Sequence, residues 1–128
     1  NTPMKYCDYK GDAVQQDYYE HMLNVFVKRS QDLVDEHMKQ FSWDSKLAIS
    51  KGRKYDKIIS EDVHDEERHS SKRVWAFVDK TNGNILKPEG WKKPAKHARG
   101  NIYEDDCMQF VTHSGPAYMD TIKEYYGA

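Results

Sequence analysis

Apolar residues in the first third of the chain recur at spacings of three and four, which is typical of one face of a helix. This stripe consists of Val14, Tyr18, Met22, Val25, Phe26, Leu33, Val34, Met38 and Phe41. No Gly or Pro interrupts residues 13–43, and Asp12 with Gln15 fits a capping box at the start. We therefore predict one helix from about residue 13 to about residue 40. A break near Arg29–Ser30, where the stripe thins, is the alternative.

The period then changes from helical to alternating. Leu47 and Ile49 alternate with polar neighbours, and a second apolar group at residues 55–59 follows a turn at residues 50–53. This pattern predicts a β-hairpin. The next stretch, residues 61–68, is almost entirely charged, so we predict an exposed loop there.

Two further strands are predicted around a tight turn. Residues 74–78 are apolar on both faces and rich in strand-forming side chains, which is typical of an interior strand. Asn82–Gly83 supplies the turn, and residues 85–87 form a return strand that Pro88 ends. Residues 88–101 contain two Pro, two Gly and many cations, and they are predicted to be a loop.

The end of the chain has the features of a short helix. Gly115–Pro116 fits a helix start with Pro at the first helical position. Tyr118, Ile122 and Tyr125 then share one face of a helix that is predicted to continue to about residue 126.

Together these elements predict an α+β fold. A long N-terminal helix packs on an antiparallel sheet of about four strands, and a short C-terminal helix packs on one face. The chain has 128 residues, no internal repeat and no linker-like stretch, so residues 1–128 are predicted to form a single domain.

Composition limits the classes of function. The 20 Lys and Arg against 21 Asp and Glu give a formal net charge of −1, so attraction to nucleic acid must come from local patches. The 2 Cys, Cys7 and Cys107, do not make a disulfide framework and are expected to be reduced. No apolar run of membrane-spanning length and no signal peptide is visible, so we expect no membrane partner and no secretion. The chain opens with Asn1, and Met4 is a candidate natural start.

Motifs in the second half of the chain resemble a known group of proteins. A strand ending in F-V-D at residues 77–79 is followed, after a turn with Gly, by K-P-x-x-W-K-x-P-A-K-x-x-R at residues 87–99. Together with residues 51–59 and the later Gly115-Pro116-Ala117-Tyr118, these motifs are similar to small uncharacterised proteins of tailed bacteriophages. The resemblance covers residues 51–119 with gaps. It implies a phage or prophage source, hence the cytoplasm of an infected host cell or a virion, and it implies no activity.

The predicted loop after Pro88 combines cations with an aromatic ring. Cations that track phosphates and a ring that stacks on a base are the usual equipment for binding single-stranded nucleic acid. The candidate nucleic-acid-binding residues are Lys87, Trp91, Lys92, Lys93, Lys96 and Arg99, with Arg53 and Lys54 in the hairpin. The hairpin also carries Lys46, Lys51 and Lys57, so the two segments form one basic face if they share an edge of the sheet.

A purely structural role explains the same residues. Trp91 could fill the core while Lys92 and Lys93 flank it in water. Pro88 and Pro94 fix a rigid path around Trp91, either to hold the ring for recognition or to close the fold. The exposure of Trp91 decides between these interpretations.

The acidic stretch is a weak candidate for a metal site. His64 and His69 lie among carboxylates, which can bind a transition metal, but their spacing matches no zinc pattern. Residues 61–67 carry five negative charges and could instead shield the basic face or dock on a basic partner. We expect a solvated loop without metal.

Candidate catalytic groups are also weak. A reactive pair of Cys107 and His113 is disfavoured because residues 104–106 are acids, which raise the pKa of a thiol. A nuclease-like set of carboxylates with a lysine occurs in any polar loop, here as Asp79, Lys80 and Glu89. We therefore expect no catalytic residue and no cofactor, and we predict a protein that is not an enzyme.

The long helix offers a second type of function. Tyr19, Val27 and Val34 widen its apolar face, which favours burial against a second chain and predicts a homodimer through this helix. A tyrosine-rich N-terminus with Tyr6 and Tyr9 could extend that surface. Two hypotheses thus stay open: an accessory protein that binds single-stranded nucleic acid, and a protein–protein interaction module, either a virion component or a modulator of a host protein.

Overall fold

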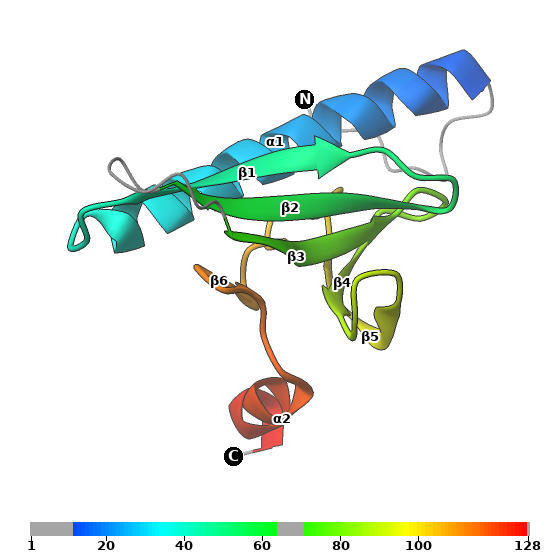
Figure 1. The fold of residues 1–128 in the computed structure, drawn as a ribbon. Coiled ribbons are helices and arrows are strands. Elements are labelled where there is room, and N and C mark those ends of the chain that lie inside the picture. Colours follow the sequence, from blue (N-terminus) through cyan, green and yellow to red (C-terminus); the bar gives the residue numbers. More distant parts are fainter. Residues whose placement is uncertain (1–11, 64–70, 128) are drawn as a thin grey trace.

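The fold consists of one long helix, a five-stranded antiparallel sheet, a small strand pair and a terminal helix (Figure 1). The computed structural model describes residues 12–63 and 71–127, with side chains at 16–63 and 71–123. The elements are α1 (Asp12–Met38), β1 (Asp44–Ser50), β2 (Tyr55–Val63), β3 (Ser71–Asp79), β4 (Asn84–Pro88), β5 (Pro94–Asn101), β6 (Val111–Thr112), β7 (Gly115–Pro116) and α2 (Met119–Gly127). Strands β1 to β5 are hydrogen-bonded in sequence order. The predicted α+β fold is confirmed, with one strand more than the four expected.

Helix α1 is continuous and buries one stripe of side chains. The buried positions are spaced by three or four residues: Tyr19, Leu23, Phe26, Ser30 and Val34. The predicted alternative, a break near Arg29–Ser30, does not occur. The apolar stripe thins there because fully buried Ser30 occupies it, with its hydroxyl 3.8 Å from the sulfur of Met108.

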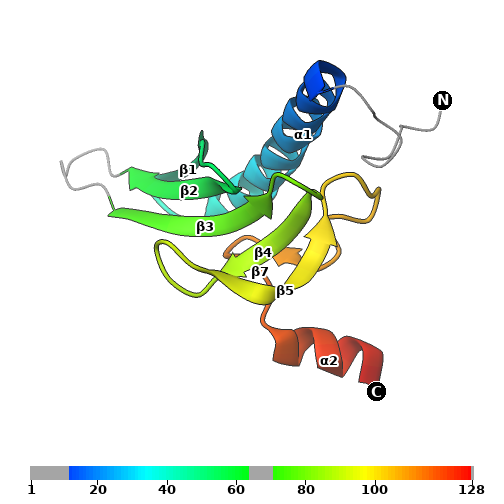
Figure 2. The same cartoon turned by 90° about the vertical axis from the view of Figure 1, so that its right-hand side faces the viewer.

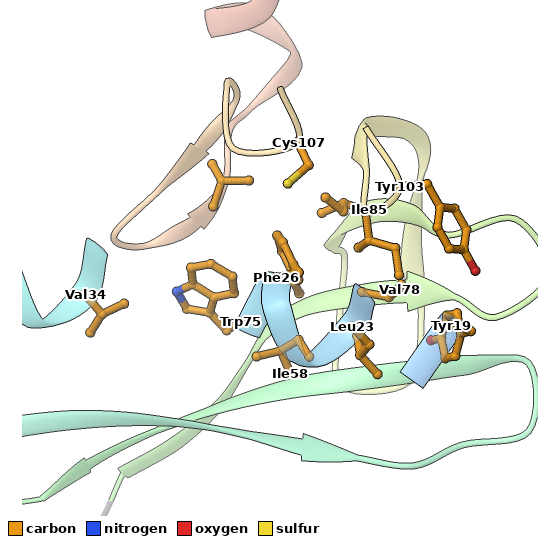
Figure 3. Packing of buried hydrophobic residues seen from close by; sticks show 13 residues of the cluster. Tyr19, Leu23, Phe26, Val34, Ile58, Trp75, Val78, Ile85, Tyr103 and Cys107 are labelled. Carbon is orange, nitrogen blue, oxygen red and sulfur yellow. The ribbon is translucent and has the colours of Figure 1, made fainter. Parts of the chain in front are cut away.

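The main core lies between α1 and the sheet. Figure 3 shows Leu23 and Phe26 of α1 beside Ile58 and Trp75 of the sheet. The Phe26 and Trp75 rings lie 6.3 Å apart in a tilted arrangement, within the range at which aromatic pairs stabilise a core. Figure 1 shows α1 passing behind β1 and β2, so the sheet has one face toward α1 and one away from it.

The hairpin of β1 and β2 is tied to α1 by one buried carboxylate. Asp56 is fully buried and accepts hydrogen bonds from the Tyr19 hydroxyl at 2.9 Å, the Gly52 amide at 3.0 Å and the Lys51 ammonium at 2.9 Å. Burial, and then the charge of Asp56, raise the pKa of Tyr19 far above its usual range. A buried charge is tolerated only with such partners, so these bonds fix the predicted turn at residues 50–53.

An irregularity in the sheet places two consecutive residues of β3, Trp75 and Ala76, on the same face. Ile58 pairs with Ala76 and Ile59 pairs with Val74, which leaves Trp75 as an extra residue on β3. Trp75 therefore joins the core under α1, whereas Val74 and Phe77 form a second buried cluster on the other face. The predicted interior strand with two apolar faces is confirmed.

The prediction of a loop over residues 88–101 is wrong from Pro94 onward. Residues 94–101 form β5, which pairs with β4 (Pro88 with Pro94, Ile85 with Gly100) through two irregularities of register. The strand has a neighbour in the sheet on one side only and buries one of its eight residues, Arg99, so the sequence shows no apolar alternation. The predicted turn at Asn82–Gly83 is confirmed, with Gly83 at a φ of 80°.

The predicted acidic loop is wrong at its start. Glu61, Asp62 and Val63 belong to β2, which has hydrogen-bonded partners on both sides in β1 and β3. Backbone pairing with β1 and β3 holds Glu61 and Asp62 in the strand despite their charge, and Val63 pairs with Asp44 of β1. The rest of the acidic stretch, with His64 and His69, lies outside the described residues.

The prediction of a helix start at Gly115–Pro116 is also wrong. These residues form β7, in which Pro116 pairs with Val111. Gly115 has a φ of 116° and lies against the Trp75 carbonyl, where a side chain would clash. Helix α2 begins at Met119 and stands away from the sheet, attached through buried Ile122 (Figures 1 and 2).

Candidate functional site

The face of the sheet that points away from α1 presents three rows of side chains. Each row takes one residue from β1, β2 and β3 in register. The first row is charged: Lys46, Glu61 and Lys72. The middle row is apolar: Ala48, Ile59 and Val74. The third row is Ser50, Lys57 and Phe77.

Trp91 stands over this face. It lies in the loop between β4 and β5, which Figure 2 shows beneath β3 and which is closed by the Glu89 amide donating to the Lys93 carbonyl at 2.9 Å. The Trp91 side chain is 51% exposed. The Lys57 ammonium lies 5.4 Å from the centre of the Trp91 ring and 5.8 Å from that of Phe77, so cation–π contacts orient the indole.

Trp91 and the three rows line a groove with a volume of about 350 Å³. We call it the Trp91 groove; its lining residues are Lys46, Ala48, Ile49, Ser50, Lys57, Ile59, Glu61, Lys72 and Trp91. The volume is near the lower end of the range for small-molecule sites. Three lysines and one glutamate make the lining net positive in a protein whose total charge is −1.

The charges of the groove are only loosely paired. Glu61 lies 3.9 Å from the Lys72 ammonium, and their side chains are 36% and 59% exposed, so this pair contributes little to stability. Within the part of the chain that the structure describes, Lys46 and Lys57 form no ion pair. Their ammonium groups are therefore available to an anionic ligand.

Of the predicted binding residues, only Trp91 lines the groove. Lys92, Lys96 and Arg53 are exposed and lie in the β4–β5 loop, in β5 and in the β1–β2 turn, respectively. Lys93 is exposed but pairs with Glu89 at 3.5 Å, and exposed Lys54 lies 5.3 Å from the ring of Tyr55. The exposure of Trp91 contradicts the interpretation in which this ring fills the core.

The other two predicted residues serve a different part of the molecule. Lys87 donates to the Pro116 carbonyl at 3.0 Å and lies 4.0 Å from the ring of Tyr118. Arg99 is 6% exposed and donates through Nε to the Ala117 carbonyl at 3.0 Å and through Nη1 to the His97 carbonyl. Both side chains hold backbone of their own chain.

A third cation completes this arrangement. Arg73 donates to the Ser114 carbonyl at 3.0 Å, so Arg73, Lys87 and Arg99 bind three carbonyls of residues 114–117. We call these three cations the carbonyl clamp. Burial, then the charges of Arg99 and Arg73, lower the pKa of Lys87, and burial lowers the pKa of Arg99. Among the described side chains none of the three cations forms an ion pair.

Sequence reasoning missed two groove residues, Glu61 and Lys72. The available signal for Glu61 was its position two residues after Ile59, because both side chains share one face if the strand continues. Lys72 had no such signal, since the extra residue in β3 shifts its alternation relative to Phe77.

The weaker candidates for catalysis are engaged elsewhere. Cys107 is buried, and this burial raises the pKa of its thiol. The Nη1 atom of Arg29 lies 3.3 Å from the Cys107 sulfur. His113 stacks on His37 with ring centres 3.5 Å apart. The Asp79 carboxylate accepts from Thr81, and the Lys80 ammonium donates to the Gly52 carbonyl.

The width of the apolar face of α1 has an explanation within one chain. Tyr19 and Val34 are both buried, and Val27 packs against the same core. The residues that motivated a homodimer are therefore covered by the protein's own sheet. Among the described side chains of α1, Val25 is the large apolar one that is exposed, at 36%.

Comparison with known proteins identifies the family. A model described as a family of unknown function, DUF7717, matches residues 4–119. The chain belongs to this family. Membership of an uncharacterised family was expected, and the DUF7717 match spans both the Trp91 groove and the carbonyl clamp. No match was found among curated proteins or among solved structures. Over residues 12–63 and 71–127, no helix is both long and apolar enough to cross a membrane.

Proposed function

We propose that the protein binds single-stranded nucleic acid in the Trp91 groove. One observation carries the proposal: a half-exposed indole stands over a sheet face whose outer rows carry Lys46, Lys57 and Lys72. An exposed aromatic ring beside cations is the arrangement with which proteins stack one base and hold the neighbouring phosphates.

The geometry favours an unpaired strand over a duplex. The ring of Trp91 can stack only on a base whose face is free, and in a duplex both faces are covered by neighbouring base pairs. Trp91 shares the lining of the groove with the apolar side chains of Ala48 and Ile59, which suit the second face of the base better than a phosphate. A base held between them is shielded from water on both faces.

The lysines at the two ends of the groove are suited to phosphates. The rows of Lys57 and of Lys46 with Lys72 are four residues apart along β2, a separation of about 13 Å. Phosphates on either side of the stacked base would thus meet a cation at each end. Exposed Lys92 and Lys96 extend the positive surface, whereas Lys87 and Arg99 have no part in this proposal.

The test is the affinity for a fluorescently labelled mixed-sequence single strand as salt is varied. Two phosphate contacts, one at each end of the groove, predict that the logarithm of the association constant falls with the logarithm of salt concentration with a slope of about −1.4. Trp91→Ala is expected to weaken binding roughly 5- to 150-fold, because base stacking on a protein ring contributes about 1–3 kcal/mol.

Two lysine variants distinguish binding in the Trp91 groove from non-specific attraction to positive charge elsewhere on the protein. Lys46→Gln is expected to flatten the salt slope by about 0.7, the value for one lost phosphate contact on a single strand. Lys28→Gln removes an exposed cation of α1, far from the groove lining, and is expected to leave the slope unchanged. No binding at low salt, or equal effects of the two variants, overturns the proposal and leaves the protein–protein interaction module as the surviving hypothesis.

The resemblance of residues 51–119 extends the proposal to a biological setting. We propose a non-enzymatic accessory protein of a tailed bacteriophage, located in the infected cell or in the virion. The described lining of the Trp91 groove contains one carboxylate and no histidine or cysteine, which supports binding rather than acid–base or nucleophilic chemistry.

A further inference from the structure

Among the charged residues in the described lining of the Trp91 groove, Glu61 is the one that phosphate binding does not explain. A carboxylate repels phosphates, yet Glu61 lies in the middle of the charged row, between Lys46 on β1 and Lys72 on β3. Its weak 3.9 Å pair with Lys72 leaves most of its capacity to accept hydrogen bonds unused. A group that can only accept, placed in a ligand groove, calls for a ligand that donates.

The position of Glu61 fits the edge of a base rather than the backbone of the strand. Glu61 is two residues along β2 from Ile59 in the apolar row, a distance of about 7 Å. A base stacked between Trp91 and the apolar row would therefore direct one edge at the charged row. That row offers a donor from Lys46, an acceptor from Glu61 and a donor from Lys72.

We propose that Glu61 selects bases with a ring N–H beside a carbonyl, namely thymine, uracil and guanine, over cytosine and adenine. The inference rests on the proposed function, because it names the part of the nucleic acid that enters the Trp91 groove. The ring N–H donates to the Glu61 carboxylate, and the adjacent carbonyl oxygen accepts from Lys72, which leaves Lys46 to bind a phosphate. Each group of the charged row then has a partner of the opposite kind.

Cytosine and adenine fit less well for a stated reason. Their ring nitrogen at the same position is an acceptor, so a lone pair would face the carboxylate. Their amino group can still donate to Glu61, but only by displacing the base along the row, which leaves one lysine without its acceptor. The expected discrimination is about fivefold to tenfold, as for the loss of one charge-assisted hydrogen bond in a partly exposed site.

A ribose 2′-hydroxyl could also donate to a carboxylate. Lys72 beside Glu61 favours the base, because a base edge supplies a carbonyl acceptor for this lysine and a lone hydroxyl supplies none. Two comparisons distinguish the base from the sugar as the hydrogen-bond donor to Glu61. Oligo(dT) and oligo(dC) differ in the base edge, whereas oligo(rC) and oligo(dC) differ in the sugar.

The experiment measures the affinity of the full chain for these three homopolymers at one salt concentration. We expect oligo(dT) to bind about fivefold to tenfold more tightly than oligo(dC), and oligo(rC) to equal oligo(dC). In Glu61→Gln the ratio of oligo(dT) to oligo(dC) is expected to fall below about twofold, because an amide can both donate and accept and thus fits either base.

Glu89→Gln is the matched control. It removes another exposed carboxylate of the same region, which pairs with Lys93 and does not line the groove. It should raise the affinity for every oligonucleotide by the same factor and leave the ratio unchanged. Tight binding without base discrimination, a ratio that survives Glu61→Gln, or a preference for oligo(rC) over oligo(dC) that Glu61→Gln removes overturns this inference while the proposed function stands. Absence of binding to all three homopolymers refutes both.

Discussion

Two sets of cations, the carbonyl clamp and the lysines of the Trp91 groove, are interleaved in the sequence but do different things. Lys87 and Trp91 are four residues apart, yet Lys87 binds the Pro116 carbonyl and Trp91 stands over Lys57. Arg99 lies in the same predicted binding motif and is almost completely buried. Sequence proximity therefore groups cations that the strand geometry separates.

The difference is one of hydrogen-bond partners. Each clamp cation donates to a backbone carbonyl of residues 114–117, and two of them have lowered pKa values because burial disfavours their charge. The groove lysines 46 and 57 donate to no described backbone carbonyl and stay in contact with solvent or aromatic rings. A cation whose donors are already used stabilises the fold, whereas one whose donors are free can bind a ligand.

The largest effect that would sharpen this comparison is on stability. Arg99→Met keeps the aliphatic bulk but leaves the buried Ala117 carbonyl without its donor, so it is expected to lower the free energy of unfolding by about 3 kcal/mol. Urea unfolding of the variant measures this change. Lys96→Met on the same strand alters an exposed cation and should change stability by less than about 0.5 kcal/mol. Equal losses in the free energy of unfolding for the two variants would show that Arg99 of the carbonyl clamp stabilises the fold no more than an exposed cation does.

The next effect concerns the accessibility of the groove. Quenching of tryptophan fluorescence by acrylamide should fall clearly in Trp91→Phe, because Trp91 is 51% exposed whereas Trp75 is 1% exposed. Trp43→Phe, which removes a half-buried ring directly before β1, is the control and should reduce quenching less. Saturating oligo(dT) should protect wild-type protein and leave Trp91→Phe unchanged. A wild-type protein as poorly quenched as Trp91→Phe would place this indole in the core.

The smallest expected effect is on the pH dependence of stability near the clamp. Burial, then His37 and Arg73, lower the pKa of His113, whose carbonyl also accepts from the indole of Trp75. The unfolded chain therefore binds a proton more readily than the folded one, and stability falls as pH drops below the ordinary histidine value of about 6.5.

Melting temperatures at pH 7.5 and pH 5.5 test this sign. The loss on acidification should be smaller in His113→Gln than in the wild type, because the variant has no proton to gain at this position. His97→Gln alters an exposed histidine of β5 and should keep the wild-type loss. A wild-type loss that His113→Gln leaves intact would show that the stacked pair with His37 does not contribute.

Much of the fold could be predicted from local pattern. The helical period of α1, the hairpin around Gly52, the interior strand at residues 74–78 and the turn at Gly83 all follow from local propensity and burial. Strand β5 and the end of β2 were missed because their strand state depends on backbone pairing with distant neighbours. Neither segment alternates apolar and polar residues in a way that reveals it.

Only part of the candidate site could be predicted from the same local patterns. Trp91 with lysines around it was predicted as a recognition element, and its exposure keeps that interpretation open. The identity of its neighbours was not predictable: Lys72 and Glu61 come from different strands and meet only through the register of β2 with β3. The burial of Arg99 likewise depends on residues 114–117 passing beneath it.

By itself the sequence determined α1, the hairpin of β1 and β2, strand β3 and the residues that carry charge or rings, because these depend on neighbours along the chain. Tertiary structure alone decided which cations bind carbonyls and which face the groove. The reason is that a strand directs successive side chains to opposite faces, so one residue of register, or one extra residue such as Trp75, moves a side chain from ligand surface to interior.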